Sequence, residues 1–426
     1  MRSLSIPIGR LKLLCRRHVA LLQVFFLFSA LLPLAVVLLG GYGWPGGSSS
    51  WSGSVRAALG LFLLMALLYG KWRGIHLNRS VLFLTSLLFA WVALSSLAIA
   101  ENPDSLRRVI VLVVFILSVS LASQQGERYL CLILKCSVLL AVVAALLSLF
   151  NFYAICGLDI RYRASPLTKS GLAGFADFGN SIISGMHFAF SAVVAFWISL
   201  NASRKREVSF WLLCFSVISA YVVLTYSRSA WLALGISCLV LVLCSKRRFF
   251  LFSLGILSAV VGMVFLALYH PDVFLIEQSR GITYRDVIWQ GVLKQMQGYW
   301  LVGHGAGESI LPIAIPSGQV VSNTHGLHLE VLFQYGLIGL VLWILLTFCS
   351  IGLLSQNIHR SPLAALGLCL LISSTGVMFF ELHGFIHTPN LVWQWVWFPL
   401  ALASSRSICR KGLPGLRGIP GRSNCS

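Results

Sequence analysis

Long apolar runs separated by short polar turns dominate the sequence. Runs of the length needed to cross a bilayer predict about twelve helices. These runs lie at residues 18–40, 55–70, 81–99, 106–123, 129–156, 180–200, 208–226, 229–245, 249–269, 327–354, 361–380 and 389–405. The pattern therefore predicts an all-α polytopic membrane protein, with residues 1–405 forming one transmembrane domain.

One polar interruption, residues 270–326, is much longer than the others. Its apolar residues recur at a spacing that predicts an amphipathic helix lying along the membrane surface. Thr283 and Asp286 have the spacing of a capping box at its start, and Gly298 is expected to end it. Three later glycines predict a tight turn back toward the membrane. The apolar residues are Ile288, Trp289, Val292, Leu293 and Met296, and the glycines are Gly303, Gly305 and Gly307.

Composition supports a membrane protein. The chain is 58% hydrophobic and only 10% charged, whereas soluble domains carry about 25% charged residues. Its net charge of +20 comes from short basic clusters between apolar runs, a pattern typical of membrane topology rather than of nucleic-acid binding. The positive-inside rule predicts that both termini are cytoplasmic and that the long loop lies on the opposite face. The tail, residues 406–426, is rich in glycine and proline and is predicted to be disordered.

Tryptophans recur at every second position in the first half of the last apolar run. Tryptophan is enriched at membrane–water interfaces, so these residues are expected to form part of an interfacial aromatic belt. They are Trp393, Trp395 and Trp397.

Several arginines lie on the predicted outer face, against the charge rule. Arg228 falls in the short turn Tyr226–Ser229 between two apolar runs, where a charge is costly unless it is paired. A single arginine there could equally extend to lipid phosphate. Arg161 and Arg163 in a second loop and Arg285 in a third favour a shared anionic ligand, because guanidinium binds phosphate in a bidentate manner.

His325 lies just before an apolar run on the same face, beside Asn323. An imidazole can take a proton from a hydroxyl at neutral pH, so His325 is a candidate general base; the alternative is a solvated or helix-capping histidine. His328 follows one turn later and is expected to face the same cavity. The competing histidines are His304, His383 and His387.

The acidic residues are isolated, which argues against metal catalysis. Only Glu101 and Asp104 on the outer face have ligand-like spacing, and a helix cap at Ser105 explains them more simply. No metal or cofactor is therefore expected. Arginines would instead neutralise the charge on a phosphate leaving group.

Three stretches resemble the O-antigen ligase and O-antigen polymerase superfamily of bacterial inner-membrane glycosyltransferases. The likeness covers roughly residues 160–345. One departure is Gly326, where the family usually has asparagine after the histidine, and Asn323 is the candidate to replace it. The three stretches are Thr225–Ala230; Arg285 and Trp289 with Leu301–Gly307; and His325–Leu332 leading into Tyr335–Leu340.

The resemblance implies a GT-C-like membrane fold and the transfer of a polysaccharide from undecaprenyl diphosphate to a sugar hydroxyl of lipid A–core. The reaction would occur without metal on the periplasmic face of the Gram-negative inner membrane. His325 would be the base, and Arg228 and Arg285 would bind the diphosphate and stabilise its departure. The residues that would assist in substrate binding are Arg161, Arg163, Tyr226, Asn323 and His328.

Two related activities and one unrelated activity remain as alternatives. An O-antigen polymerase and a protein O-oligosaccharyltransferase share the donor chemistry and differ in the acceptor. A transporter of lipid-linked glycans would need charged groups deep within its spans. Lys135 is the only clear charge in the middle of a predicted helix, so an enzyme is favoured.

Overall fold

The computed structural model describes residues 8–44, 47–69, 76–157, 166–245, 255, 272–281 and 283–409. Within these ranges the chain is mainly helical, with one two-stranded antiparallel sheet. Eight of the described helices are long and apolar enough to cross a membrane, and two shorter ones are also apolar. The predicted all-α polytopic membrane protein is confirmed.

The long apolar helices largely follow the predicted runs, although α2 begins before its predicted start at residue 55. The predicted span 249–269 lies outside the described residues apart from Gly255. The long helices are α1 (Ile8–Gly40), α2 (Gly47–Tyr69), α3 (Arg79–Ala98), α4 (Pro103–Gln125), α5 (Glu127–Cys156), α6 (Ser181–Asn201), α7 (Lys205–Leu224) and α12 (Leu327–Ser355). The shorter helices are α8 (Arg228–Cys244) and α13 (Pro362–Val377).

The last predicted span, residues 389–405, is not one regular helix. It consists of a π-helical segment, η2 (Trp393–Trp397), followed by α14 (Phe398–Ser404). The predicted tail begins with the short α15 (Arg406–Cys409), and the rest of the tail lies outside the described residues. Helix α4 begins at Pro103 and is capped by the side chain of Asn102, so the expected cap at Ser105 is wrong.

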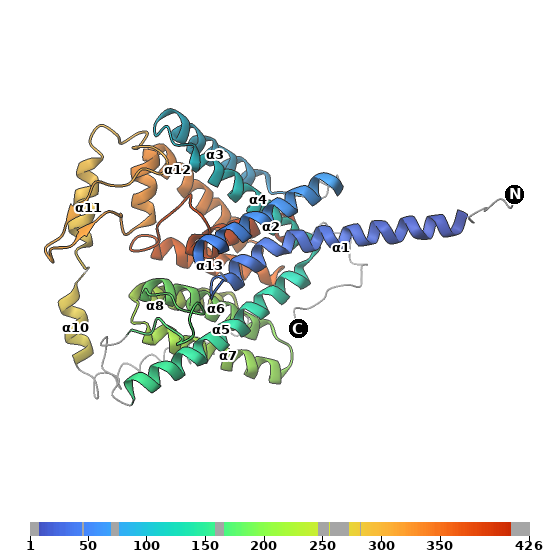
Figure 1. Ribbon diagram of the computed structural model, residues 1–426, viewed down its shortest axis with the longest axis horizontal. Helices are drawn as coiled ribbons and strands as arrows, with labels where there is room; N and C mark the ends of the chain where they lie inside the picture. Colours follow the sequence, from blue (N-terminus) through green and yellow to red (C-terminus); the bar gives the residue numbers. More distant parts are fainter. Residues whose placement is uncertain are drawn as a thin grey trace.

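The helices pack around one large core. Helix α6 lies against α7 and α8, and α13 packs on α8. Helix α1 packs on α2 and α4, and α12 packs on α3. Figure 1 shows α10 (Asp272–Arg280) and α11 (Arg285–Gln295) at the end of the bundle opposite the start of α1. Both belong to the long polar loop, so this end carries the loop.

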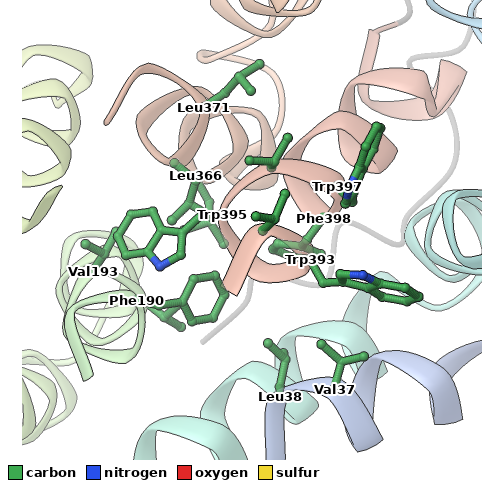
Figure 2. Close-up of a cluster of buried hydrophobic side chains, with 14 of the residues drawn as sticks. Val37, Leu38, Phe190, Val193, Leu366, Leu371, Trp393, Trp395, Trp397 and Phe398 are labelled. Carbon is green, nitrogen blue, oxygen red and sulfur yellow. The ribbon is translucent and has the colours of Figure 1, made fainter. Parts of the chain in front are cut away.

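The three tryptophans of η2 lie in the middle of this core, and the predicted aromatic belt is wrong. All three are at most 1% exposed. Figure 2 shows Trp395 beside Phe190 of α6, with Trp393 nearer to α1. Each indole N–H donates to a backbone carbonyl, at 3.2 Å from Nε1 in every case, so burial leaves none unpaired. These bonds satisfy the polar atom that otherwise keeps tryptophan at an interface.

The predicted amphipathic helix is present as α11, and its apolar face is covered by protein. Ile288 and Val292 pack with Leu332 and Phe333 of α12. The predicted capping box is wrong, because the helix follows the left-handed residue Tyr284 and has no side-chain cap. Further along the loop, β1 (Ile313–Ala314) pairs antiparallel with β2 (Val320–Val321).

Helix α12 is broken at Gly336, and the loop bonds into the break. Gly336 has φ of 65°, and the Leu301 backbone lies where a Cβ would be. The amide of Leu337 donates to the Trp300 carbonyl at 2.8 Å, and the amide of Gly305 donates to the Gln334 carbonyl at 3.0 Å. The predicted glycine turn is therefore hydrogen-bonded to α12 near the break. The first part of this helix follows His325 in the sequence.

Candidate active site

Two cavities open at the loop end of the bundle. The large cavity, about 990 Å³, is lined by the α1–α2 connection, residues 173–183 and residues 381–391. The small cavity, about 710 Å³, is lined by the turn 226–229, the start of α11 and the β1–β2 hairpin. Ile182, His325 and Glu381 line both cavities. These three residues therefore form the boundary between the two spaces.

Arg228 lines the small cavity as the first residue of α8. Ser227 caps that helix by accepting a hydrogen bond from the Ala230 amide. This cap fixes the first turn of the helix and therefore the position of Arg228. The guanidinium donates to Glu277 Oε2 at 2.5 Å and to the Gly281 carbonyl at 2.6 Å. The charge is therefore paired, as its position in a short turn between two apolar helices requires.

Arg285 lines the small cavity as the first residue of α11. Its Nε donates to the Phe380 carbonyl at 3.0 Å, and its terminal nitrogen Nη2 bonds the carboxylate of Glu381. Its side chain is 16% exposed and that of Glu381 is 7% exposed. Two guanidinium groups from helices far apart in sequence thus line the same small cavity.

His325 sits in a left-handed conformation, with φ of 47°, immediately before α12. Its amide donates to Asn323 Oδ1 at 3.3 Å, and Thr324 Oγ1 donates to the Gly326 carbonyl at 2.9 Å. A Cβ on Gly326 would lie 2.8 Å from the Phe379 carbonyl oxygen. This close approach explains why residue 326 has no side chain, and it brings His325 beside the loop that carries Glu381.

The environment of His325 favours the neutral imidazole. Burial lowers the pKa of His325, and the charges of Arg285 and His383 lower it further. Burial also raises the pKa of the Glu381 carboxyl, and its ion pair with Arg285 opposes that rise. A neutral histidine at pH 7 can accept a proton, as a general base must.

The structure brings together most of the predicted site residues that it describes. Tyr226 lines the small cavity and Asn323 lines the large one. His328 lines neither cavity: its Nε2 donates to the Thr375 carbonyl at 3.2 Å, and its Nδ1 accepts from Trp343. Arg161 and Arg163 lie outside the described residues, so their roles stay predictions.

The competing histidines have other partners or other positions. His304 is stacked between Tyr299 and Phe333, at ring-centroid distances of 4.1 and 4.3 Å. His383 lines only the large cavity, and His387 forms a hydrogen bond with its neighbour Thr388. Among the histidines of the described ranges, His325 is therefore the one that reaches both cavities.

Sequence analysis missed the two carboxylates that pair with the arginines. Glu277 and Glu381 stand alone in the sequence and lie 49 and 96 positions from Arg228 and Arg285. Their shared signal was weak: each is an acid on the same predicted face as Arg228 and Arg285. It also missed His187, in the apolar α6, which lines the large cavity.

Comparison with known proteins agrees with the resemblance seen in the sequence. Residues 212–344 match the protein-family model described as O-Antigen ligase, a range that contains Arg228, Arg285 and His325. The chain is also 25% identical over 395 residues to an O-antigen ligase of Pseudomonas aeruginosa, covering 91% of this chain and 93% of that protein. The resemblance to the O-antigen ligase family is confirmed.

Proposed function

We propose that this protein, which is similar to O-antigen ligases over most of its length, is a glycosyltransferase of lipopolysaccharide synthesis. It would move a polysaccharide from undecaprenyl diphosphate to a sugar hydroxyl of lipid A–core. The observation that carries the proposal is the position of His325 on the boundary between the arginine-lined small cavity and the large cavity.

The small cavity is the proposed site for the donor diphosphate. Arg228 and Arg285 both line it, and each guanidinium can bind phosphate oxygens in a bidentate manner. Glu277 and Glu381 bond these guanidinium groups with carboxylate oxygens. Those oxygens are of the same chemical kind as the oxygens of a diphosphate, which supports an anion site here.

His325 is the proposed general base. The acceptor hydroxyl would attack the anomeric carbon of the donor sugar and give its proton to the imidazole. The bond between that carbon and the diphosphate oxygen would break, and the electron pair would leave with the diphosphate. Arg228 and Arg285 would stabilise the charge on the departing oxygen without a metal ion. The lowered pKa of His325 keeps the imidazole ready to accept the proton.

The large cavity is the proposed site of the acceptor. It meets the donor cavity at His325, so an acceptor hydroxyl placed there would lie next to the base. Its lining mixes indole and phenyl rings with amides and two carboxylates, which suits a sugar. In this proposal the enzyme is a multi-pass protein of the Gram-negative inner membrane, both cavities face the periplasm, and both termini are cytoplasmic.

Deletion of the gene tests the acceptor. A ligase mutant is expected to accumulate lipid-linked polymer and to make lipid A–core without polysaccharide. Core that carries a single repeat would identify a polymerase instead, and loss of glycan from proteins alone would identify a protein O-oligosaccharyltransferase.

Replacement of His325 tests the mechanism in a purified transfer assay. His325→Ala should lower kcat by about 10²-fold or more, the usual contribution of a general base, while binding of undecaprenyl diphosphate stays near wild type. His328→Gln is the matched control, because His328 lies one turn away and outside both cavities. Full activity of His325→Ala, or an inactive but folded His328→Gln, would contradict the assignment.

A further inference from the structure

Four consecutive apolar side chains are exposed in the loop after α11. They are between 37% and 66% exposed, and none of them lines either cavity. The surrounding stretch, residues 295–307, contains no lysine, arginine, aspartate or glutamate. A run of this kind is unfavourable in water and marks a surface that contacts another apolar phase or molecule. The four residues of this 299–302 segment are Tyr299, Trp300, Leu301 and Val302.

The 299–302 segment is hydrogen-bonded to α12 at its break. Three consecutive carbonyls of the segment accept backbone hydrogen bonds, and two of the donors are the amides that follow Gly336. Backbone polar groups in a bilayer need partners within the protein, because the hydrocarbon offers none. The bonds join the carbonyls of Tyr299, Trp300 and Leu301 to the amides of Gly303, Leu337 and Ile338, at 2.8, 2.8 and 3.3 Å. These carbonyls can therefore lie at the edge of a membrane without losing a hydrogen bond.

The surface of α12 changes from covered to exposed at this break. From Leu327 to Gly336 the helix has no exposed residue, whereas Leu337, Ile338 and Val341 after the break are exposed. At about 1.5 Å per residue, the part after the break, residues 337–355, is roughly 28 Å long. That length matches the hydrocarbon core of a bilayer, which is about 30 Å thick. The edge of the hydrocarbon on the loop side is therefore expected at the break.

Helix α3 presents apolar surface beside the same break. Trp91 Nε1 of α3 donates to the Tyr335 carbonyl of α12 at 2.9 Å, one residue before Gly336. Leu97, further toward the end of α3, is exposed. The chain after the 299–302 segment reaches this end of α3, since a Cβ on Gly305 would lie 2.6 Å from the Cβ of Ala100. The segment thus adjoins apolar surface on two helices of membrane-spanning length.

We propose that the 299–302 segment inserts into the interfacial layer of the bilayer, where lipid head groups meet acyl chains. Tyrosine and tryptophan are enriched in this layer, because each combines an apolar ring with one polar atom. Lipid is the partner because the segment continues the exposed apolar side of α12 and the stretch around it carries no acidic or basic residue. The tryptophans of η2 are buried, so Trp300 takes the interfacial position that they were expected to hold.

Insertion of this segment has a consequence for the small cavity. Arg285 begins α11, and α11 leads directly into the segment. The loop that carries Arg285 is thereby fixed to the bilayer surface, from which a lipid-linked donor would arrive. Only this consequence rests on the proposed function. The lipid contact is measured without glycan transfer, so its failure and the failure of the proposed function are separate results.

Photo-crosslinking tests which molecule covers the segment. The photoreactive residue p-benzoylphenylalanine replaces Leu301, Val341 or Ser317 in three proteins, and each is illuminated in phospholipid nanodiscs. Val341 is the lipid-facing control on α12, and Ser317 is an exposed residue between β1 and β2. Mass spectrometry should find lipid adducts at positions 301 and 341 and lose them at position 317. Lipid adducts at 301 no more frequent than at 317 would overturn the proposal, and so would crosslinks from 301 to a second copy of this chain in place of lipid.

Thiol labelling tests whether the same position is shielded from water. Leu301→Cys and Ser317→Cys are labelled in nanodiscs with a charged, water-soluble maleimide, and the labelling of wild type is subtracted. Each rate is divided by the rate of the same variant unfolded in SDS. A thiol in an apolar layer forms less thiolate, so Leu301→Cys should react at least about fivefold more slowly than Ser317→Cys. Equal normalised rates would place residue 301 in water and refute the insertion.

Discussion

Arg285 and Glu381 form an ion pair in the wall between the two cavities, beside His325. Arg285 faces the small cavity, whereas Glu381 lines both. The charge proposed to bind the donor is thereby fixed next to the base proposed to activate the acceptor. The loop that carries Glu381 thus connects the two halves of the candidate site.

Replacing either arginine with lysine should remove most activity although the charge is kept. A point ammonium cannot reproduce the bidentate contacts of guanidinium, so we expect kcat/KM to fall at least about tenfold in Arg228→Lys and in Arg285→Lys. Free undecaprenyl diphosphate should also inhibit both variants less than wild type. Lys294→Ala is the matched control, because Lys294 is exposed on α11 and lines neither cavity. Equal inhibition of wild type and both variants would place the arginines outside the donor site.

Activity should fall in acid, with a midpoint below pH 6.5. Protonation inactivates a base, and burial together with Arg285 lowers the pKa of His325 below its ordinary value of about 6.5. kcat/KM should therefore be flat near neutral pH and fall as pH drops through the pKa of the folded protein. The lowered pKa of His325 also makes the free energy of unfolding depend on pH. Its contribution is constant above about pH 6.5 and decreases as the pH falls below that value, because the unfolded chain takes up the proton at a higher pH than the folded protein.

The same pH profile has an internal control. Arg285→Gln removes a nearby positive charge, so the acidic limb of its residual activity should move to higher pH. Arg285→Lys keeps the charge, and its limb should stay close to that of wild type. A limb that is identical in all three proteins would mean that it reports a group other than His325.

Transfer should proceed fully in excess EDTA. Two permanently charged guanidinium groups in the small cavity are proposed to stabilise the leaving diphosphate, which is the role that a divalent cation has in many glycosyltransferases. The assay is run with purified protein with and without EDTA, then with added Mg²⁺ or Mn²⁺. Activity that is lost in EDTA and restored by either ion would refute the arginine mechanism.

Gly336→Ala should destabilise the protein. Residue 336 has φ of 65°, which costs about 1–3 kcal/mol for a residue with a side chain, and a Cβ would collide with the Leu301 backbone. The melting temperature in detergent should fall clearly. Gly352→Ala, on the same helix with open space around its Cβ position, should leave the melting temperature unchanged or raise it. Similar melting temperatures for the two variants would show that the helix break does not require glycine at position 336.

The sequence predicted which residues line the two cavities better than it predicted how those residues are paired. Arg228, Arg285 and His325 could be found because each is a polar residue on the predicted outer face, in a stretch resembling one family. Glu381 could not be found, because a pairing between residues 96 positions apart depends on how loops pack. His328 has the spacing of a neighbour of His325, yet the packing of α12 turns its ring toward Thr375.

The helical spans were predictable from length and hydropathy, but their depth in the protein was not. The spacing of Trp393, Trp395 and Trp397 is the same for a surface belt and for a buried π-helical segment. The segment is buried because α1, α6 and α13 surround it. That packing cannot be predicted from the local sequence pattern. The left-handed Tyr284 at the start of α11 likewise replaced a capping box whose sequence spacing was correct.

The break in α12 has a consequence for recombination between related proteins. Gly303 and Gly336 approach so closely that a Cβ on Gly303 would lie 2.6 Å from the Gly336 amide nitrogen. Each glycine has a positive φ, and each also lies against the other segment, so the two positions form one structural unit. A chimera whose crossover falls between them is viable when both parents supply glycine at their own position. Where one parent has a larger residue, the segments around 303 and 336 must be exchanged together.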